Sequence, residues 1–169
     1  DTALRLIHHS FNLTNKSLVK LYNRPDAVLI CPDAGATKKI EHYMEWNKNL
    51  TEVAYCIKTR DLKERGKVAL KVLEPEKCND RNCVIIDDLC DGGATFVAIA
   101  EQIKPAHLTL VVTHGIFSKG FGALEAKFDH IITTNSYRES GESKKVTTLR
   151  LNMCFMGQSD QPESARWTL

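Results

Sequence analysis

The sequence predicts an α/β protein with an open, mostly parallel, doubly wound sheet and helices on both faces. First, short runs rich in Val, Ile and Leu recur along the chain, and such runs suit strands that are buried on both faces. Second, several of these runs alternate with segments of helical spacing, as expected for successive βα units. Third, two strand-to-helix junctions carry acidic residues and glycines, where open parallel sheets bind their ligands.

Composition limits the possible classes of protein. The 169 residues suffice for one domain with a real core, and 43% hydrophobic with 26% charged residues is ordinary for a soluble protein. A formal charge of +2 gives no broad basic field, so nucleic-acid binding has no compositional support. No run approaches the roughly 20 apolar residues of a membrane span, and no signal peptide is visible.

The six cysteines are scattered, and several lie in apolar, strand-like runs. They show no CxxC spacing and no accompanying histidine pattern, which argues against a metal knuckle. We therefore expect buried, reduced thiols in a cytoplasmic protein. The residues are Cys31, Cys56, Cys78, Cys83, Cys90 and Cys154.

The ends of the chain are expected to lie outside the folded domain. Residues 2–22 have helical spacing, and the chain starts at Asp1 with what resembles the middle of a longer element. We expect a fragment or processed chain in which residues 1–26 form a helical linker from an upstream domain. The domain itself is predicted over 27–155, and 156–169 is expected to be a polar tail.

The first βα unit predicts an anion site. Residues 27–31 form an apolar strand that Pro32 ends, and a helix is expected over 38–49. Between them lies the turn Asp33-Ala34-Gly35-Ala36-Thr37. Glycine-rich turns at a helix start bring backbone N–H groups toward anions.

A charged segment between two further strands predicts a hairpin. The strands are expected over 52–57 and 68–73, and the residues between them are polar and rich in charge. Such a segment favours a mobile flap rather than core. Its cations, Lys58 and Arg60 among them, can close over a polyphosphate, although an exposed charged loop explains the pattern equally well.

A second strand end combines carboxylates with a glycine turn. The apolar strand 84–86 runs into Asp87 and Asp88, and the turn Asp91-Gly92-Gly93-Ala94-Thr95 precedes a helix over 96–103. The turn suits a phosphate, and the adjacent carboxylates suit hydroxyl groups. The combination predicts a sugar-phosphate site, often with a metal.

The rest of the chain continues the βα pattern. His114 follows a strand at the same expected sheet edge, and it is either a ligand contact or a satisfied loop histidine. An antiparallel edge strand is expected near the end of the domain. The predicted elements are a strand over 108–113, a helix over 120–128, a strand over 130–134 and the edge strand over 146–155.

Four motifs resemble one protein family. Residues 83–96 are similar to the phosphoribosyl-pyrophosphate motif of type I phosphoribosyltransferases and of ribose-phosphate pyrophosphokinases. Residues 31–35, Cys-Pro-Asp-Ala-Gly, resemble the kinases' pyrophosphate loop, usually Ser-Pro-Asp-Ala-Gly. Residues 112–118 resemble their Thr-His-Gly segment, and residues 58–60 match the Lys-x-Arg of their flexible loop. The motifs occur in order between 27 and 152 and resemble the kinases' carboxyl-terminal domain.

The resemblance implies a fold, a reaction and roles for single residues. The fold would be that of the type I phosphoribosyltransferases with a flexible β-hairpin flap. The reaction would transfer diphosphate from Mg²⁺-ATP to the 1-hydroxyl of ribose 5-phosphate, and the protein would be a homo-oligomer. The implied ribose-phosphate site is Asp87 and Asp88 for the hydroxyls, with Asp91, Gly92, Gly93, Ala94 and Thr95 for the 5-phosphate. The implied catalytic groups are Lys58 and Arg60, and the implied diphosphate loop is Asp33, Ala34 and Gly35, with Asp33 at the metal.

The chain also departs from the family pattern. Cys31 replaces the usual Ser, and Ala36 stands where a second Gly is common. The amino-terminal domain that supplies most of the adenine pocket in this family has no counterpart before residue 27. Two alternatives stay open: a phosphoribosyltransferase that modifies a nucleobase, and a non-catalytic regulatory homologue.

Overall fold

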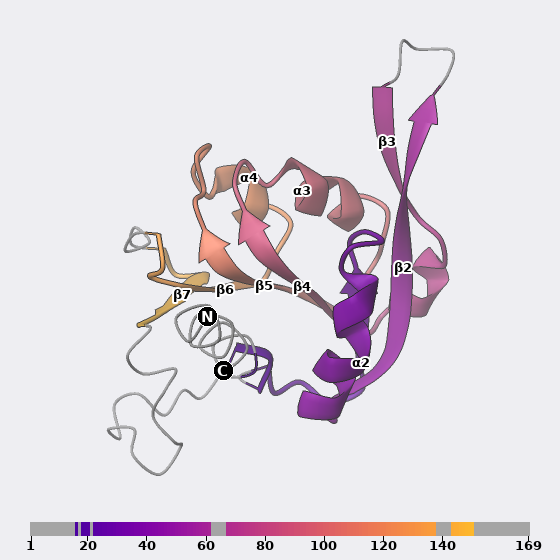
Figure 1. The fold of residues 1–169 in the computed structure, drawn as a ribbon, viewed down its shortest axis with the longest axis horizontal. Coiled ribbons are helices and arrows are strands. Elements are labelled where there is room, and N and C mark those ends of the chain that lie inside the picture. Colours follow the sequence, from indigo (N-terminus) through magenta and orange to yellow (C-terminus); the bar gives the residue numbers. More distant parts are fainter. Residues whose placement is uncertain (1–15, 17, 21, 62–66, 138–142, 151–169) are drawn as a thin grey trace, which may run out of the picture.

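The computed structural model describes residues 16, 18–20, 22–61, 67–137 and 143–150, which form one sheet flanked by helices (Figure 1). The strands are β1 (Ala27–Cys31), β2 (Leu50–Asp61), β3 (Lys67–Val72), β4 (Asn82–Cys90), β5 (His107–Gly115), β6 (His130–Thr134) and β7 (Val146–Leu149). The helices are α2 (Thr37–Trp46), the 3₁₀ helix η1 (Pro75–Cys78), α3 (Ala94–Ala100) and α4 (Gly122–Glu125).

The seven strands lie in the order β3-β2-β1-β4-β5-β6-β7. All neighbours pair in parallel except β2 and β3, which are antiparallel. β1 is an inner strand, and all five of its residues are buried, as its unbroken apolar sequence predicts. From β1 the chain passes to β2 on one side and later to β4 on the other. The sheet therefore has its topological switch point between β1 and β4.

The core lies on both faces of the sheet, which confirms the doubly wound prediction. On one face, Phe96 and Ile99 of α3 and Leu124 of α4 pack against side chains of β4 and β5. On the other face, Ile40 and Tyr43 of α2 pack against alternate residues of β1 and β4. Successive strand residues point to opposite faces, so each apolar strand contributes to both layers.

The predicted antiparallel edge strand is wrong in direction. The strand exists over Val146–Leu149, but it pairs in parallel with β6, from Ile131 opposite Val146 to Thr134 opposite Leu149. Antiparallel neighbours need only a short hairpin, whereas the connection 135–145 is long enough to return the chain to the start of β6. The antiparallel edge of the sheet is β3, at the opposite end.

The predicted hairpin is present and is the most extended feature of the molecule (Figure 1). β2 pairs with β1 only as far as Tyr55 and continues to Asp61, so its second half is supported by β3 alone. The predicted strand 52–57 is thus longer at its carboxyl end, because the charged residues after it remain paired across the hairpin. The predicted flap tip, 62–66, lies outside the described residues.

Gly115, at the end of β5, marks a close approach between the strand and the core. A Cβ on Gly115 would lie 2.1 Å from Cε2 of Phe117 and 2.6 Å from Oγ1 of Thr133. Gly115→Ala is therefore expected to destabilise the protein by about 1–3 kcal/mol, the usual cost of overpacking. Thermal unfolding measures the effect. Gly122→Ala is the control, because no atom lies within 4 Å of a Cβ placed there, and it should leave the midpoint unchanged or slightly higher.

The thiol prediction is confirmed for the cysteines that the structure describes. Cys31, Cys56, Cys78, Cys83 and Cys90 are buried and free. Cys154, the polar tail and most of the expected amino-terminal helix lie outside the described residues, although residues 18–20 are helical. Among the described segments, no helix is both long enough and apolar enough to cross a membrane.

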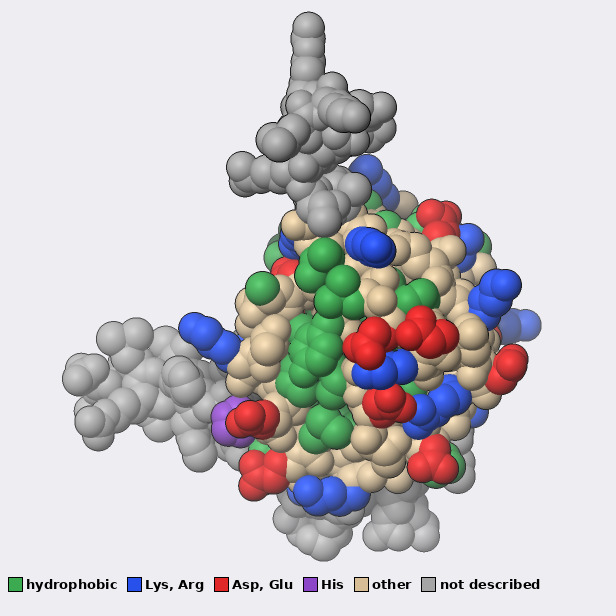
Figure 2. Space-filling model, turned by 90° about the vertical axis from the view of Figure 1, so that its right-hand side faces the viewer, with side chains coloured by type: hydrophobic (Ala, Val, Ile, Leu, Met, Phe, Trp, Pro, Cys, Tyr) green, Lys and Arg blue, Asp and Glu red, His purple; other side chains and the backbone are tan. Residues whose placement is uncertain are grey.

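The face on the side of β2 and β3 carries a band of hydrophobic side chains beside a cluster of alternating charges (Figure 2). The exposed hydrophobic residues of this part of the chain are Tyr55 and Ile57 on β2 and Leu73 just after β3. The ion pairs include Lys77 with Glu74 and Arg81 with Glu52. Exposed apolar bands of this kind often mark contact surfaces.

Candidate active site

The loop after β1 is organised by the carboxylate of Asp33. The Ala36 N–H donates to Oδ1 of Asp33 (3.1 Å) and also lies 3.2 Å from the Asp33 carbonyl. The Cys31 thiol donates to the same carbonyl (3.2 Å), where the family more often has a serine hydroxyl. A Cβ on Gly35 would lie 3.2 Å from Asp33 Oδ1, so this position favours glycine. The loop is therefore folded before any ligand arrives.

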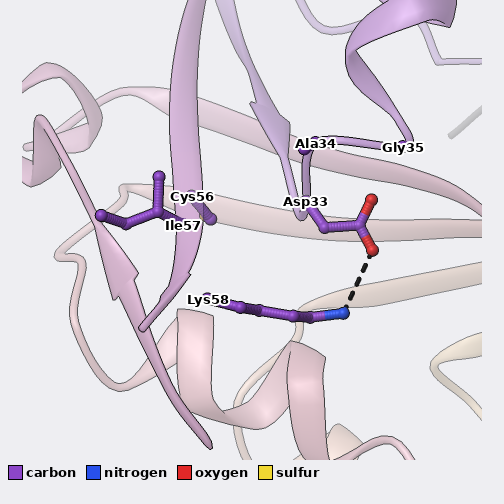
Figure 3. A pocket seen from close by; sticks show the side chains of 6 residues that line it. All are labelled: Asp33, Ala34, Gly35, Cys56, Ile57 and Lys58. Atoms are coloured by element: carbon purple, nitrogen blue, oxygen red, sulfur yellow. Dashed lines mark hydrogen bonds and ion pairs between the residues drawn. The ribbon is translucent and has the colours of Figure 1, made fainter. Parts of the chain in front are cut away.

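Lys58 reaches this loop from the hairpin. Its Nζ lies 3.2 Å from Oδ2 of Asp33, and this ion pair forms part of the lining of a cavity of about 440 Å³ (Figure 3). The cavity is lined by Asp33, Ala34, Gly35, Cys56, Ile57 and Lys58. The predicted diphosphate loop and one predicted catalytic cation thus share a single cavity, although they are 25 residues apart in sequence.

The charge on Asp33 is favoured despite partial burial. Burial raises the pKa of this carboxyl, but the Ala36 N–H and the Lys58 ammonium outweigh it and hold the pKa below its ordinary value. Asp33 is therefore an anion over the whole neutral range. Lys58 is half-exposed, so it can leave Asp33 for an incoming anion at little cost.

Asp87 and Asp88 lie inside β4, which continues beyond them to Cys90. Asp87 accepts the N–H of Asp88 (2.8 Å). Burial raises the pKa of Asp87; the Asp88 N–H lowers it, and the charges of Asp88 and Asp33 raise it further. β1 and β4 are parallel neighbours, with Ile30 opposite Ile85, so both acidic strand ends lie at the same edge of the sheet, at the switch point.

Lys39 of α2 forms an ion pair with Oδ2 of Asp88, whose Oδ1 is buried and finds no hydrogen-bond partner among the described residues. Such an oxygen is costly to leave unpaired, and a hydroxyl donor from a ligand would satisfy it. The pair links the helix that follows the Asp33 loop to the acidic pair of β4. Nothing in the sequence indicated this link, because Lys39 and Asp88 are 49 residues apart.

The turn after β4 depends on Gly93. This residue has φ of +76°, and a Cβ there would lie 3.0 Å from Leu124 Cδ2. Both the backbone conformation and the contact with α4 therefore require glycine. Asp91 and Gly92 complete the turn between β4 and α3, and Ala94 and Thr95 of the predicted phosphate turn are the first two residues of α3.

His114 is held within its own loop cluster. Its Nδ1 lies 2.7 Å from Oγ of Ser136, which donates to the Thr113 carbonyl (3.1 Å). Of the two interpretations left open for His114, the structure favours a loop histidine whose hydrogen bond is made within the protein rather than to a ligand. Arg60 belongs to β2 opposite Val68 of β3, and its side chain lies outside the described part.

A complete protein-only metal site is absent from the described residues, where no three His, Cys, Asp or Glu side chains converge. Mg²⁺ does not require one, because it commonly uses one or two carboxylates together with water and substrate phosphates. Asp33, ionised and partly exposed at the cavity, fits that role.

Comparison with known proteins identifies relatives of this domain. No family model matches the chain. The ribose-phosphate pyrophosphokinase of Mycoplasmopsis pulmonis is 34% identical over 128 residues, which are 73% of this chain and 39% of the relative. The enzyme of the same name from Corynebacterium glutamicum is 27% identical over 143 residues, covering 79% and 42%.

A solved structure agrees with these relatives. The phosphoribosylpyrophosphate synthetase of Mycobacterium smegmatis superposes with a TM-score of 0.55 at 20% identity, over 77% of this chain and 44% of that one. At this identity the match establishes the fold. The chain spans about two fifths of the length of the curated relatives it matches. Over that region it is a homologue of the ribose-phosphate pyrophosphokinases and shares their α/β fold.

Proposed function

We propose that this chain is the carboxyl-terminal catalytic part of a ribose-phosphate pyrophosphokinase. The 1-hydroxyl oxygen of ribose 5-phosphate attacks the β-phosphorus of ATP, the bond from that phosphorus to the AMP oxygen breaks, and the hydroxyl proton is lost. The products are phosphoribosyl pyrophosphate and AMP. The observation that carries the proposal is the cavity shared by the Asp33 loop and Lys58, next to the acidic pair of β4.

The acceptor sugar is assigned to the β4 side of the switch point. Asp87 and Asp88 accept hydrogen bonds from the ribose hydroxyls, and the unpaired Oδ1 of Asp88 supports this role. The backbone N–H groups of the turn, Asp91, Gly92, Gly93, Ala94 and Thr95, bind the 5-phosphate. Lys39 balances the charge of Asp88 until the sugar binds.

The transferred diphosphate is assigned to the β1 side. The loop Asp33, Ala34 and Gly35 binds it, and Lys58 with Arg60 stabilises the charge that develops during transfer. Mg²⁺ would be held by Asp33 together with the nucleotide phosphates and would neutralise their charge. Because Lys58 pairs with Asp33 and lines the cavity, its ammonium is oriented toward the diphosphate loop.

ATP and a protein partner complete the proposal. The described residues that line the cavity include no aromatic side chain on which a base could stack, and we assign the nucleotide base to another domain or subunit. The exposed Tyr55, Ile57 and Leu73 support a homo-oligomer that covers this face. Light scattering measures the mass, and a monomer at every concentration would contradict that part of the proposal.

The decisive experiment follows the leaving group. Release of AMP from ATP in the presence of ribose 5-phosphate supports the pyrophosphokinase, while release of diphosphate from phosphoribosyl pyrophosphate and a nucleobase supports a phosphoribosyltransferase. Binding of ribose 5-phosphate without either reaction, even with a nucleotide-binding domain supplied, supports the regulatory homologue. Lys58 at the diphosphate loop favours the first outcome, since a binding-only protein has no need of a transition-state cation.

A further inference from the structure

The loop between β5 and α4 is attached to the turn after β4 by backbone hydrogen bonds. The N–H groups of Ile116 and Phe117 donate to the carbonyl of Cys90 (2.9 and 3.2 Å), and the N–H of Ser118 donates to that of Asp91 (3.2 Å). These bonds connect two consecutive strand ends directly. The position of one loop therefore determines the position of the other.

Phe117 anchors this loop in a constrained conformation. Its side chain is 1% exposed and fills the space that Gly115 leaves, while its backbone has φ of +47°. A bulky residue in the left-handed region persists only where its surroundings hold it there. The N–H of Gly120 donates to the Phe117 carbonyl (2.9 Å) and closes a turn around Lys119. Lys119 is thus presented by a preorganised turn.

The side chain of Lys119 lies over the predicted phosphate turn. A Cβ placed on Gly92 would be 3.4 Å from both Cδ and Cε of Lys119. The aliphatic part of the lysine therefore lies beside Gly92, within the predicted phosphate turn.

The charge of Lys119 is available for a ligand. Lys39 is paired with Asp88 and Lys58 with Asp33, whereas Lys119 forms no ion pair with any residue that the structure describes. The end of β4 and the turn after it carry Asp87, Asp88 and Asp91. Because these carboxylates would repel an anion bound in the turn, such an anion would need a compensating cation. Lys119 is exposed and placed to supply it.

We propose that Lys119 binds the phosphate of the sugar phosphate held by the turn Asp91–Thr95, a side-chain contact in a site otherwise built from backbone. This inference rests on the proposed function, because it adds a ligand to the same subsite. A phosphate monoester carries a charge of about −1.5 to −2 at pH 7, and a lysine ammonium is a suitable point-charge partner for it. The contact strengthens binding of phosphorylated sugars and leaves their unphosphorylated counterparts unaffected.

Calorimetry on the full chain tests the assignment with ribose 5-phosphate, inorganic phosphate and ribose as probes. Lys119→Gln removes the charge, Lys119→Arg keeps it, and Lys104→Gln is the matched control. Lys104 is exposed between α3 and β5, at the opposite end of the parallel strands, and its replacement changes the net charge equally. Lys119→Gln should weaken the binding of ribose 5-phosphate and of inorganic phosphate about tenfold or more, which is the scale of one charge-assisted hydrogen bond. Lys119→Arg and Lys104→Gln should stay within about threefold of the parent chain.

The outcomes separate this inference from the proposed function. If the parent chain prefers ribose 5-phosphate to ribose but Lys119→Gln binds it equally well, Lys119 is no ligand and the proposed function stands. If the parent chain shows no preference for the phosphorylated sugar, the phosphate turn itself is misassigned and both fail. A thermal midpoint for Lys119→Gln equal to that of the parent chain shows that any loss of binding is local.

Discussion

Lys58→Ala is expected to lower the rate of AMP release by about 10²–10³ and to change the affinity for ribose 5-phosphate by less than about threefold. The reason is position. Lys58 pairs with Asp33 at the cavity assigned to the transferred diphosphate, whereas the sugar is assigned to β4. Phosphoryl transfer depends mainly on orientation and on preorganised cations, so loss of one cation at the transferred group raises the barrier.

Lys71→Ala is the matched control for Lys58→Ala. Lys71 belongs to β3 of the same hairpin, is exposed, and pairs through its backbone with Ile57 rather than lining the cavity. Removing it changes the net charge equally but should leave turnover within about twofold. Single-turnover AMP release separates chemistry from binding, and calorimetry gives the sugar affinity. Equal rates in Lys58→Ala and in the parent chain would show that Lys58 does not act on the transferred group.

The order and type of the elements were predictable because each apolar run is long and strongly β-branched. The inner strand β1 is the clearest case, with an unbroken apolar sequence and complete burial. The direction of β7 was not predictable, since Val146–Leu149 is compatible with either pairing and the connection 135–145 alone decides it. The predicted strand 84–86 was too short for a related reason. Asp87 and Asp88 are polar but lie within β4, where Asp87 is opposite Val112 of β5.

The site was predictable where its chemistry is local to one motif. Asp33 to Gly35 and Asp91 to Thr95 each form a turn within a few residues, so their composition indicates their role. The ion pair of Lys39 with Asp88 and the approach of Lys119 to Gly92 join segments that are distant in sequence. The spacing of apolar residues along the sequence does not predict contacts between such distant segments. One signal for Lys119 was present, because it directly follows the Thr-His-Gly segment that resembles the family.

Asp87→Asn is expected to weaken ribose 5-phosphate binding about 10- to 100-fold while stabilising the ligand-free protein at pH 7. Binding falls because a neutral amide replaces an ionised acceptor of the ribose hydroxyls. The amide oxygen can still accept the Asp88 N–H, so the strand end keeps its shape. Stability rises because burial and the charges of Asp88 and Asp33 oppose ionisation of Asp87, and the variant has no charge there to oppose.

The sign of the pH dependence follows from the direction of the shift. The pKa of Asp87 is raised in the folded state above its unfolded value, which is about 3.9 for an aspartate. Its contribution to stability is therefore fully present below about pH 3.9 and is lost as the pH rises through the folded pKa. The free energy of unfolding of Asp87→Asn minus that of the parent chain should be smallest in acid and should grow to a plateau toward neutral pH.

Urea unfolding between pH 3.5 and 8 measures this difference, with Asp80→Asn as the control. Asp80 is exposed in the turn before β4 and has φ of +55°, a conformation that asparagine adopts readily. Asp80→Asn removes the same charge, but from an exposed carboxylate. The free energy of unfolding of Asp80→Asn minus that of the parent chain should therefore not grow with pH. If the difference in the free energy of unfolding between Asp87→Asn and the parent chain stays constant or shrinks toward neutral pH, burial and the neighbouring charges do not oppose ionisation of Asp87. In that case the weaker binding in the variant would come only from the replacement of a charged hydrogen-bond acceptor by a neutral one.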